Sequence, residues 1–293
     1  MKKSKLFLLL FFQLICFASF SAGIDSLLFI EETKAFLYKE IGTVLKGDFY
    51  TKWETEEKPY VYVYVSLPDR VERPKKIKDP YFAYATDEAS AIVKESELKM
   101  EGYNTFLYKT YANSWALLNN TFLSYSREAK AFVLFHEIMH NYFKQKHIKI
   151  PYEFIEPICD IIGNYGTLKY AQSTQNVNLI SAQDQIISNE RIYQCFNSTI
   201  LEINNSPLNT SKLNARCSDT INEILLNGNS FQKFRFGYKV NNAYLIKNGY
   251  YCKYYFLLKT VFLKQDSINS FLELIRKMPR KVPDCEKYLQ NFL

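Results

Sequence analysis

The feature that most constrains the fold is an almost uninterrupted apolar run from Ala129 to Phe143. A helix that is apolar around most of its circumference is normally buried on most sides. Ser126 precedes the run as a plausible N-cap, and Glu128 follows in the first turn, where the helix dipole favours an acid. The run therefore predicts a central helix, around which the rest of the chain must pack.

The few polar residues of this helix include the segment His136-Glu137-Ile138-Met139-His140. Positions i and i+4 of a helix differ by about 40° of rotation, so both imidazoles leave the same face. Two nitrogens at this spacing can reach one zinc ion at ~2.0–2.1 Å. Glu137 lies about 100° round the helix, where it can act as the general base for a metal-activated water.

A catalytic zinc ion needs a third protein ligand and an open fourth position. The candidate segment is Glu156-Pro157-Ile158-Cys159-Asp160-Ile161-Ile162-Gly163. HExxH followed by this ExxxD resembles the gluzincin metallopeptidases, the thermolysin-like clan, whose second helix often reads Glu-x-Ile-Ser-Asp-Ile-Phe-Gly. The resemblance covers about residues 126–170.

This resemblance implies Zn²⁺ as the cofactor, Glu156 as the third metal ligand and a zincin-like fold. It also implies that Asp160 hydrogen-bonds the far nitrogen of a ligating histidine. The sequence departs from the clan in two ways: the gap from His140 to Glu156 is short, and Pro157 directly follows the proposed ligand. Glu153 therefore stays as the alternative ligand.

Other zincin patterns fit less well. The metzincin extension HExxHxxGxxH requires Gly and His where this chain has Phe143 and Lys146, so that class is rejected. No histidine follows His147, so a tyrosine or arginine of the C-terminal half would have to stabilise the oxyanion. The resemblance also suggests an edge strand that binds the substrate backbone, for which Tyr111–Trp115 is the candidate.

The rest of the chain predicts a β-containing N-terminal lobe and a helical C-terminal lobe. Residues 59–66 alternate Tyr and Val, which predicts a strand with one core face; we interpret the other face as sheet surface rather than a ligand platform. Further strands are expected at 81–86 and 104–117. Helices are expected at 25–46, 155–170, 182–196, 218–227, 243–264 and 267–278, with a loop at 202–213.

The start of the chain is typical of a secretory signal peptide. Three lysines precede the apolar run Leu6 to Phe20, and small residues follow at Ser21 and Ala22. The run is short of the roughly 20 residues that a membrane span needs. We therefore expect a signal peptide at 1–21, a zincin catalytic core at 22–172 and the helical lobe at 173–293. The protein would be secreted or periplasmic, with no membrane span in the mature chain; an uncleaved anchor is the alternative.

Charge and cysteines narrow the partners and the chemistry. The chain has 37 basic and 30 acidic residues, and three of the basic ones lie in the expected signal peptide, so the remaining excess favours no nucleic-acid partner. An exported protein can form disulfides, and the nearest pairs are Cys195–Cys217 and Cys252–Cys285. Cys159, inside an apolar helix, is expected to be a buried free thiol.

Together these patterns predict an α+β zinc metallopeptidase that hydrolyses peptide bonds in a peptide or protein substrate. Two alternatives stay open. One is a non-catalytic envelope protein that keeps the zincin scaffold for binding, and the other is a zinc hydrolase of a non-peptide amide.

Overall fold

The computed structural model describes residues 25–47, 49–52, 59–78, 81–84, 87–111 and 118–293. Its described part is mixed, mostly helical with one three-stranded antiparallel sheet, which agrees with the expected α+β class. The expected signal peptide at 1–21 lies outside the described residues, as does most of the proposed edge strand Tyr111–Trp115. Among the helices that are described, none combines the length and the apolar character needed to cross a membrane.

The sheet has the order β2-β1-β3, with β1 (Tyr60–Ser66) between β2 (Tyr81–Ala83) and β3 (Asn104–Thr110). Tyr62 stands opposite Ala83 on one side and Tyr108 on the other. The valines of β1 are fully buried and pack against helix α2 (Glu88–Met100). The alternation of Tyr and Val in β1 is therefore confirmed as a strand with two different faces, while β2 and β3 are shorter than expected.

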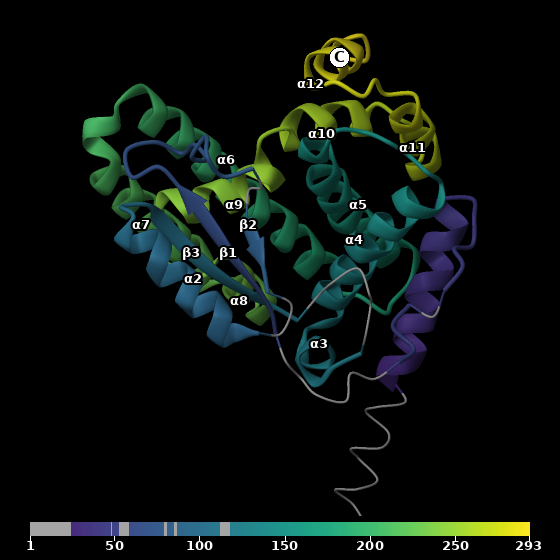
Figure 1. The fold of residues 1–293 in the computed structure, drawn as a ribbon. Coiled ribbons are helices and arrows are strands. Elements are labelled where there is room, and N and C mark those ends of the chain that lie inside the picture. The colour runs from purple at the N-terminus through teal and green to yellow at the C-terminus, as the bar shows by residue number, and fades with distance from the viewer. Residues whose placement is uncertain (1–24, 48, 53–58, 79–80, 85–86, 112–117) are drawn as a thin grey trace, which may run out of the picture.

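Two long helices, α4 (Arg127–Gln145) and α5 (Tyr152–Ser173), lie side by side at the centre of the molecule (Figure 1). The expectation of a deeply buried central helix is confirmed, because every residue from Ala129 to Met139 is buried. Ser126 is its N-cap residue, although its side chain makes no capping hydrogen bond. Helix α5 begins before the expected position and continues through Pro157, whose missing N–H leaves the Glu153 carbonyl without its usual helical partner.

Two glycines of α5 allow α4 to approach closely. A Cβ at Gly163 would lie 2.8 Å from Phe132 Cε2 and 3.2 Å from the Phe132 backbone oxygen. A Cβ at Gly166 would lie 2.7 Å from Phe135 Cδ2. Helix packing at this distance leaves no room for any larger residue.

The C-terminal half is helical, as expected, but its boundaries differ. It contains α6 (Leu179–Asn205), a 3-10 turn at Pro207–Asn209, α7 (Thr210–Leu226), α8 (Ser230–Phe236), α9 (Asn242–Cys252), α10 (Tyr255–Leu263), α11 (Ile268–Arg276) and α12 (Val282–Gln290). The loop expected at 202–213 is wrong, because Ile203 and Leu213 are buried and hold this polar stretch in helices. The helix expected at 243–264 is two helices, α9 and α10.

Helix α1 occupies the N-terminal part of the described chain, as residues 25–40, and it ends before the expected position 46. Phe36 contacts Tyr170 of α5, with ring centroids 5.1 Å apart. One hydrophobic cluster includes side chains from Phe29 to Leu289. The division into a core at 22–172 and a lobe at 173–293 stays a prediction, and residues of both parts share this cluster.

The five cysteines of the described chain are all free, so the structure contains neither of the two predicted disulfides. Cys195 Sγ and Cys217 Sγ nevertheless lie 3.2 Å apart, between α6 and α7. Cys159 is a buried free thiol, as expected.

Candidate metal centre

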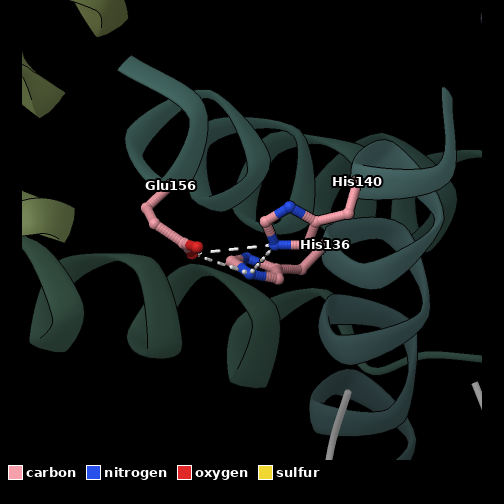
Figure 2. A group of neighbouring side chains, drawn as sticks. All are labelled: His136, His140 and Glu156. Carbon is pink, nitrogen blue, oxygen red and sulfur yellow. Dashed lines mark hydrogen bonds and ion pairs between the residues drawn. The ribbon is translucent and has the colours of Figure 1, made fainter. Parts of the chain in front are cut away.

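Three side chains from α4 and α5 converge on one point (Figure 2). His136 and His140 leave consecutive turns of α4, and their Nε2 atoms lie 3.2 Å apart. Glu156 approaches from the facing helix, with Oε2 at 3.4 Å from His136 Nε2 and 3.7 Å from His140 Nε2. The structure therefore brings together the three residues expected to ligate the metal, and this buried group could hold a metal ion.

The donor set and its spacing fit a small divalent cation. Ligand atoms held ~2.0–2.1 Å from an ion at tetrahedral angles lie roughly 3.3–3.4 Å apart, close to the separations found here. Glu156 Oε2 is buried and makes no well-formed hydrogen bond; the His136 and His140 Nε2 atoms lie 3.4 and 3.7 Å away. A buried carboxylate oxygen without a short hydrogen bond is costly, and a cation between the three side chains would remove that cost. Two imidazole nitrogens with one carboxylate oxygen are a ligand set that zinc favours.

Asp160 supports this group from behind. The residue is fully buried, and its Oδ1 lies 2.8 Å from His136 Nδ1, the nitrogen that faces away from Glu156. Its Oδ2 accepts hydrogen bonds from Arg235 Nη2 at 2.7 Å and from the Tyr193 hydroxyl. Burial alone would raise the pKa of Asp160, but Arg235 and His136 hold it at about 2. Asp160 is thus ionised and fixes the orientation of His136.

The group as a whole stabilises positive charge. Burial alone would lower the pKa of His136, but contacts with Asp160 and Glu156 raise it to about 10. Burial would raise the pKa of Glu156, but the two histidines lower it to about 2. Both shifts have one cause, the attraction between the imidazoles and the two buried carboxylates.

Glu137 directly follows His136 on α4. Together with the two histidines it lines a cavity. Its side chain is largely buried, and burial raises its pKa, although His136 and His140 oppose the shift. A carboxylate with a raised pKa beside a metal group has the character of a general base.

The cavity has a volume of about 370 Å³ and lies between the sheet and the α4–α5 pair. The tyrosine face of β1 forms one wall of it, through Tyr60, Tyr62 and Tyr64. The sequence did not predict that this face lines a cavity. Alternation alone could not reveal it, because the metal group comes to this face only through tertiary packing.

Other residues singled out from the sequence lie around this group or outside it. Glu153, the alternative ligand, points into a different cavity and is not part of the metal group. His147 is exposed just after the end of α4 and takes no part in the group. Cys159 Sγ lies 3.7 Å from His140 Nδ1, a contact that the sequence did not suggest. Arg235 and Tyr193 were also missed, since no local pattern marks either residue.

Comparison of the chain with known proteins gave no matching family model, no matching curated protein and no matching solved structure.

Proposed function

We propose that this protein is a zinc-dependent metallopeptidase of the gluzincin type, with a zincin-like arrangement of its helices and sheet. The observation that carries the proposal is the convergence of His136, His140 and Glu156, with Glu137 beside them in the same cavity. The basic and apolar start of the chain supports export, so we place the enzyme outside the cytoplasm.

A bound zinc ion would polarise the scissile carbonyl and lower the pKa of the attacking water. Glu137 would accept a proton from the attacking water and pass it to the leaving amine. Burial raises the pKa of its carboxyl, which favours proton uptake. Asp160 keeps His136 oriented, and Arg235 in turn keeps Asp160 in place.

The developing oxyanion needs a donor in the cavity, and Tyr251 is the residue that we propose. Its ring is nearly parallel to that of His136, with centroids 6.3 Å apart, and it lines the cavity. Arg235 lines the cavity too: its Nη2 donates to Asp160, while its buried Nη1 has no hydrogen-bond partner and is the second candidate donor. We place Tyr251 first because its ring stacks on that of His136 itself.

The substitution Glu137→Gln tests the proposal. The amide has nearly the same shape but cannot accept the proton, so peptide hydrolysis should fall by at least about 100-fold. Zinc content should stay at the wild-type level, because Glu137 is not one of the three grouped ligands. The measurements are zinc analysis of the purified protein and cleavage of a peptide library.

Glu128→Gln is the matched control, since Glu128 lies in the first turn of the same helix and does not line the cavity. Wild-type activity in Glu137→Gln would refute the role of this carboxylate. Zinc-loaded wild-type protein that cleaves no peptide would leave the non-catalytic binding protein or the hydrolase of a non-peptide amide.

A further inference from the structure

We propose that the cavity over the metal group continues into a second chamber, which binds a carboxylate of an extended peptide substrate. This inference rests on the proposed peptidase function for the identity of the chain that enters the cavity. The chamber itself is defined by residues that play no part in the metal centre.

Two tyrosines join the chambers. Tyr81 and Tyr152 line the cavity at the metal group and also line a second cavity of about 680 Å³. Tyr81, on the edge strand β2, contacts the rings of Tyr62 and Tyr64, each with centroids 5.3 Å apart. Tyr152 starts helix α5, one turn before Glu156, so the junction lies about 6 Å along the helix from a metal ligand.

The second chamber has an excess of positive charge. Arg73 and Lys78 line it, and among the described lining residues the acidic one is Glu153. Both basic side chains are exposed, and within the described part of the chain neither forms an ion pair with a carboxylate. Lys76 of the same segment differs, because its Nζ is paired with Glu101 at 2.6 Å. Two cations facing one acid favour an anionic ligand.

The arrangement suits a chain rather than a small molecule. Cleavage would take place at the metal group, while Arg73 and Lys78 lie beyond the Tyr81–Tyr152 junction, where Arg73 Nη1 also donates to the Lys78 carbonyl. An extended peptide advances 3.2–3.4 Å per residue, so one chain passing the junction can reach both chambers. Tyr152 is 42% exposed and its ring lies 5.3 Å from that of Tyr250, which gives the junction aromatic surfaces for the passing side chains. The carboxylate can come from an Asp or Glu side chain or from the free C-terminus of the peptide.

Binding to zinc-loaded Glu137→Gln tests the inference without relying on turnover. The probes are synthetic hexapeptides with blocked ends, in pools that carry Glu or Gln at one fixed position, and a further pool with a free C-terminal carboxylate. We expect binding about 3- to 10-fold tighter for Glu than for Gln at one position, or for the free over the blocked terminus. Adding Arg73→Gln or Lys78→Gln should remove most of this preference. Lys75→Gln, an exposed lysine of the same segment that does not line the chamber, should keep it.

The same pools are then offered to the wild-type enzyme for cleavage. Charge-selective binding without any hydrolysis would support the chamber and overturn the peptidase. Hydrolysis that is indifferent to Glu or Gln, in wild type and in Arg73→Gln alike, would overturn the chamber and leave the peptidase. Absence of peptide binding would overturn the inference as well.

Discussion

Around the candidate metal centre, buried charged side chains form a series in which each one contacts the next. Arg235 is 6% exposed, and its guanidinium lies over the rings of Phe132 and Tyr251 at 5.2 and 4.9 Å. It pairs with Asp160, which contacts His136, which faces Glu156. Because an isolated buried charge is costly, removal of one member leaves the next without compensation. The position of His136 therefore depends on residues far from it in the sequence.

The substitution His140→Ala removes one of three grouped nitrogen and oxygen donors. Zinc affinity should fall by more than the 10- to 100-fold loss that is typical for a partner outside the ligand set. Competition with a chromophoric chelator measures the dissociation constant. His147→Ala is the control, because His147 is exposed at the end of the same helix. Full zinc affinity in His140→Ala would exclude this imidazole as a ligand.

Lys247 is a second buried charge, and among the described residues it forms no ion pair, although Asp160 and Glu156 lie near enough to oppose the lowering of its pKa. The residue is 1% exposed, with Nζ 4.3 Å from the ring centroid of Tyr108 and 3.5 Å from Asn248 Oδ1. Burial, with the nearby Arg235, lowers its pKa to about 7. In the unfolded chain the pKa returns to about 10.4, so between these values the unfolded state binds more protons. Stability attributable to Lys247 should therefore rise as the pH increases from about 7 to 10.4.

Lys247→Met should remove this dependence while keeping the length of the side chain. We expect a gain on the order of 1–3 kcal/mol in the free energy of unfolding at pH 7, with a smaller gain at pH 9. Urea titrations at both pH values measure it, with Lys264→Met as an exposed control. A gain that is the same at both pH values would contradict the lowered pKa.

At the scale of single residues, helical periodicity in the sequence predicted which side chains share one face of a helix. The four-residue spacings of His136 to His140 and of Glu156 to Asp160 place each pair on one face of its helix. That Glu156 would meet the two histidines was inferred from the family resemblance rather than from spacing, and the structure does bring the three together. Arg235 and Tyr193 come to Asp160 from separate helices, at distances in sequence that no pattern encodes. Lys247 likewise has no sequence signal, because burial depends on the packed neighbours.

The geometry of the candidate metal centre depends on how helices α4 and α5 pack against each other. Gly163 and Gly166 lie against Phe132 and Phe135, about two and three turns after Glu156. The distance between the helices in turn fixes the separation between Glu156 and the two histidines. Small changes in helix packing should therefore appear as changes in metal affinity.

Gly163→Ala tests this coupling. The new Cβ would meet both a ring atom at 2.8 Å and a backbone oxygen at 3.2 Å, and the backbone oxygen cannot turn away. We expect a loss of about 1–3 kcal/mol in the free energy of unfolding, with weaker zinc binding. Gly249→Ala is the control: its Cβ would lie 3.6 Å from Ile200 Cδ1, an ordinary contact, and stability should stay equal or rise. Unchanged stability and zinc affinity in Gly163→Ala would contradict the coupling.

The elements were predicted well where apolar periodicity is strong and poorly where it is weak. The buried helix α4 and the strand β1 agree with expectation. Helix α2 was not predicted, because only Ala91 and Leu98 are buried and the apolar stripe is narrow. The stretch at 202–213 was assigned to a loop from its Asn, Ser and Thr content, yet two buried side chains suffice to keep it helical.

At the scale of the whole molecule, the cavity lies where the sheet meets α4 and α5. A metal ion bound by His136, His140 and Glu156 would cross-link these two helices. A ligand that binds only the folded state stabilises it by about 2.7 kcal/mol at a concentration 100 times its dissociation constant. For a chain of this size we expect addition of zinc to the metal-free protein to raise Tm by roughly 5–10 °C. Differential scanning calorimetry, with and without a chelator, measures the shift. The same addition to His140→Ala should have little effect, and an equal shift in that variant would indicate binding elsewhere.

The arrangement of the elements in space was the feature that the sequence predicted least well. Class and helix content could be inferred, because they follow from local patterns. The meeting of a tyrosine face with a metal group could not, because β1 and α4 are separated by segments whose path the sequence does not define. The second chamber was hidden for the same reason, since its lining comes from three separate parts of the chain.

The alternation of β1 has a consequence for how this protein can change. Its valines pack against α2, while its tyrosines line the cavity, so the two faces of the strand require different side chains. Inserting or deleting a single residue within the strand would reverse both sets beyond that point, placing valines at the cavity and tyrosines against α2. A length change inside β1 should therefore be far more damaging than the exchange of one tyrosine, which alters only the lining of the cavity.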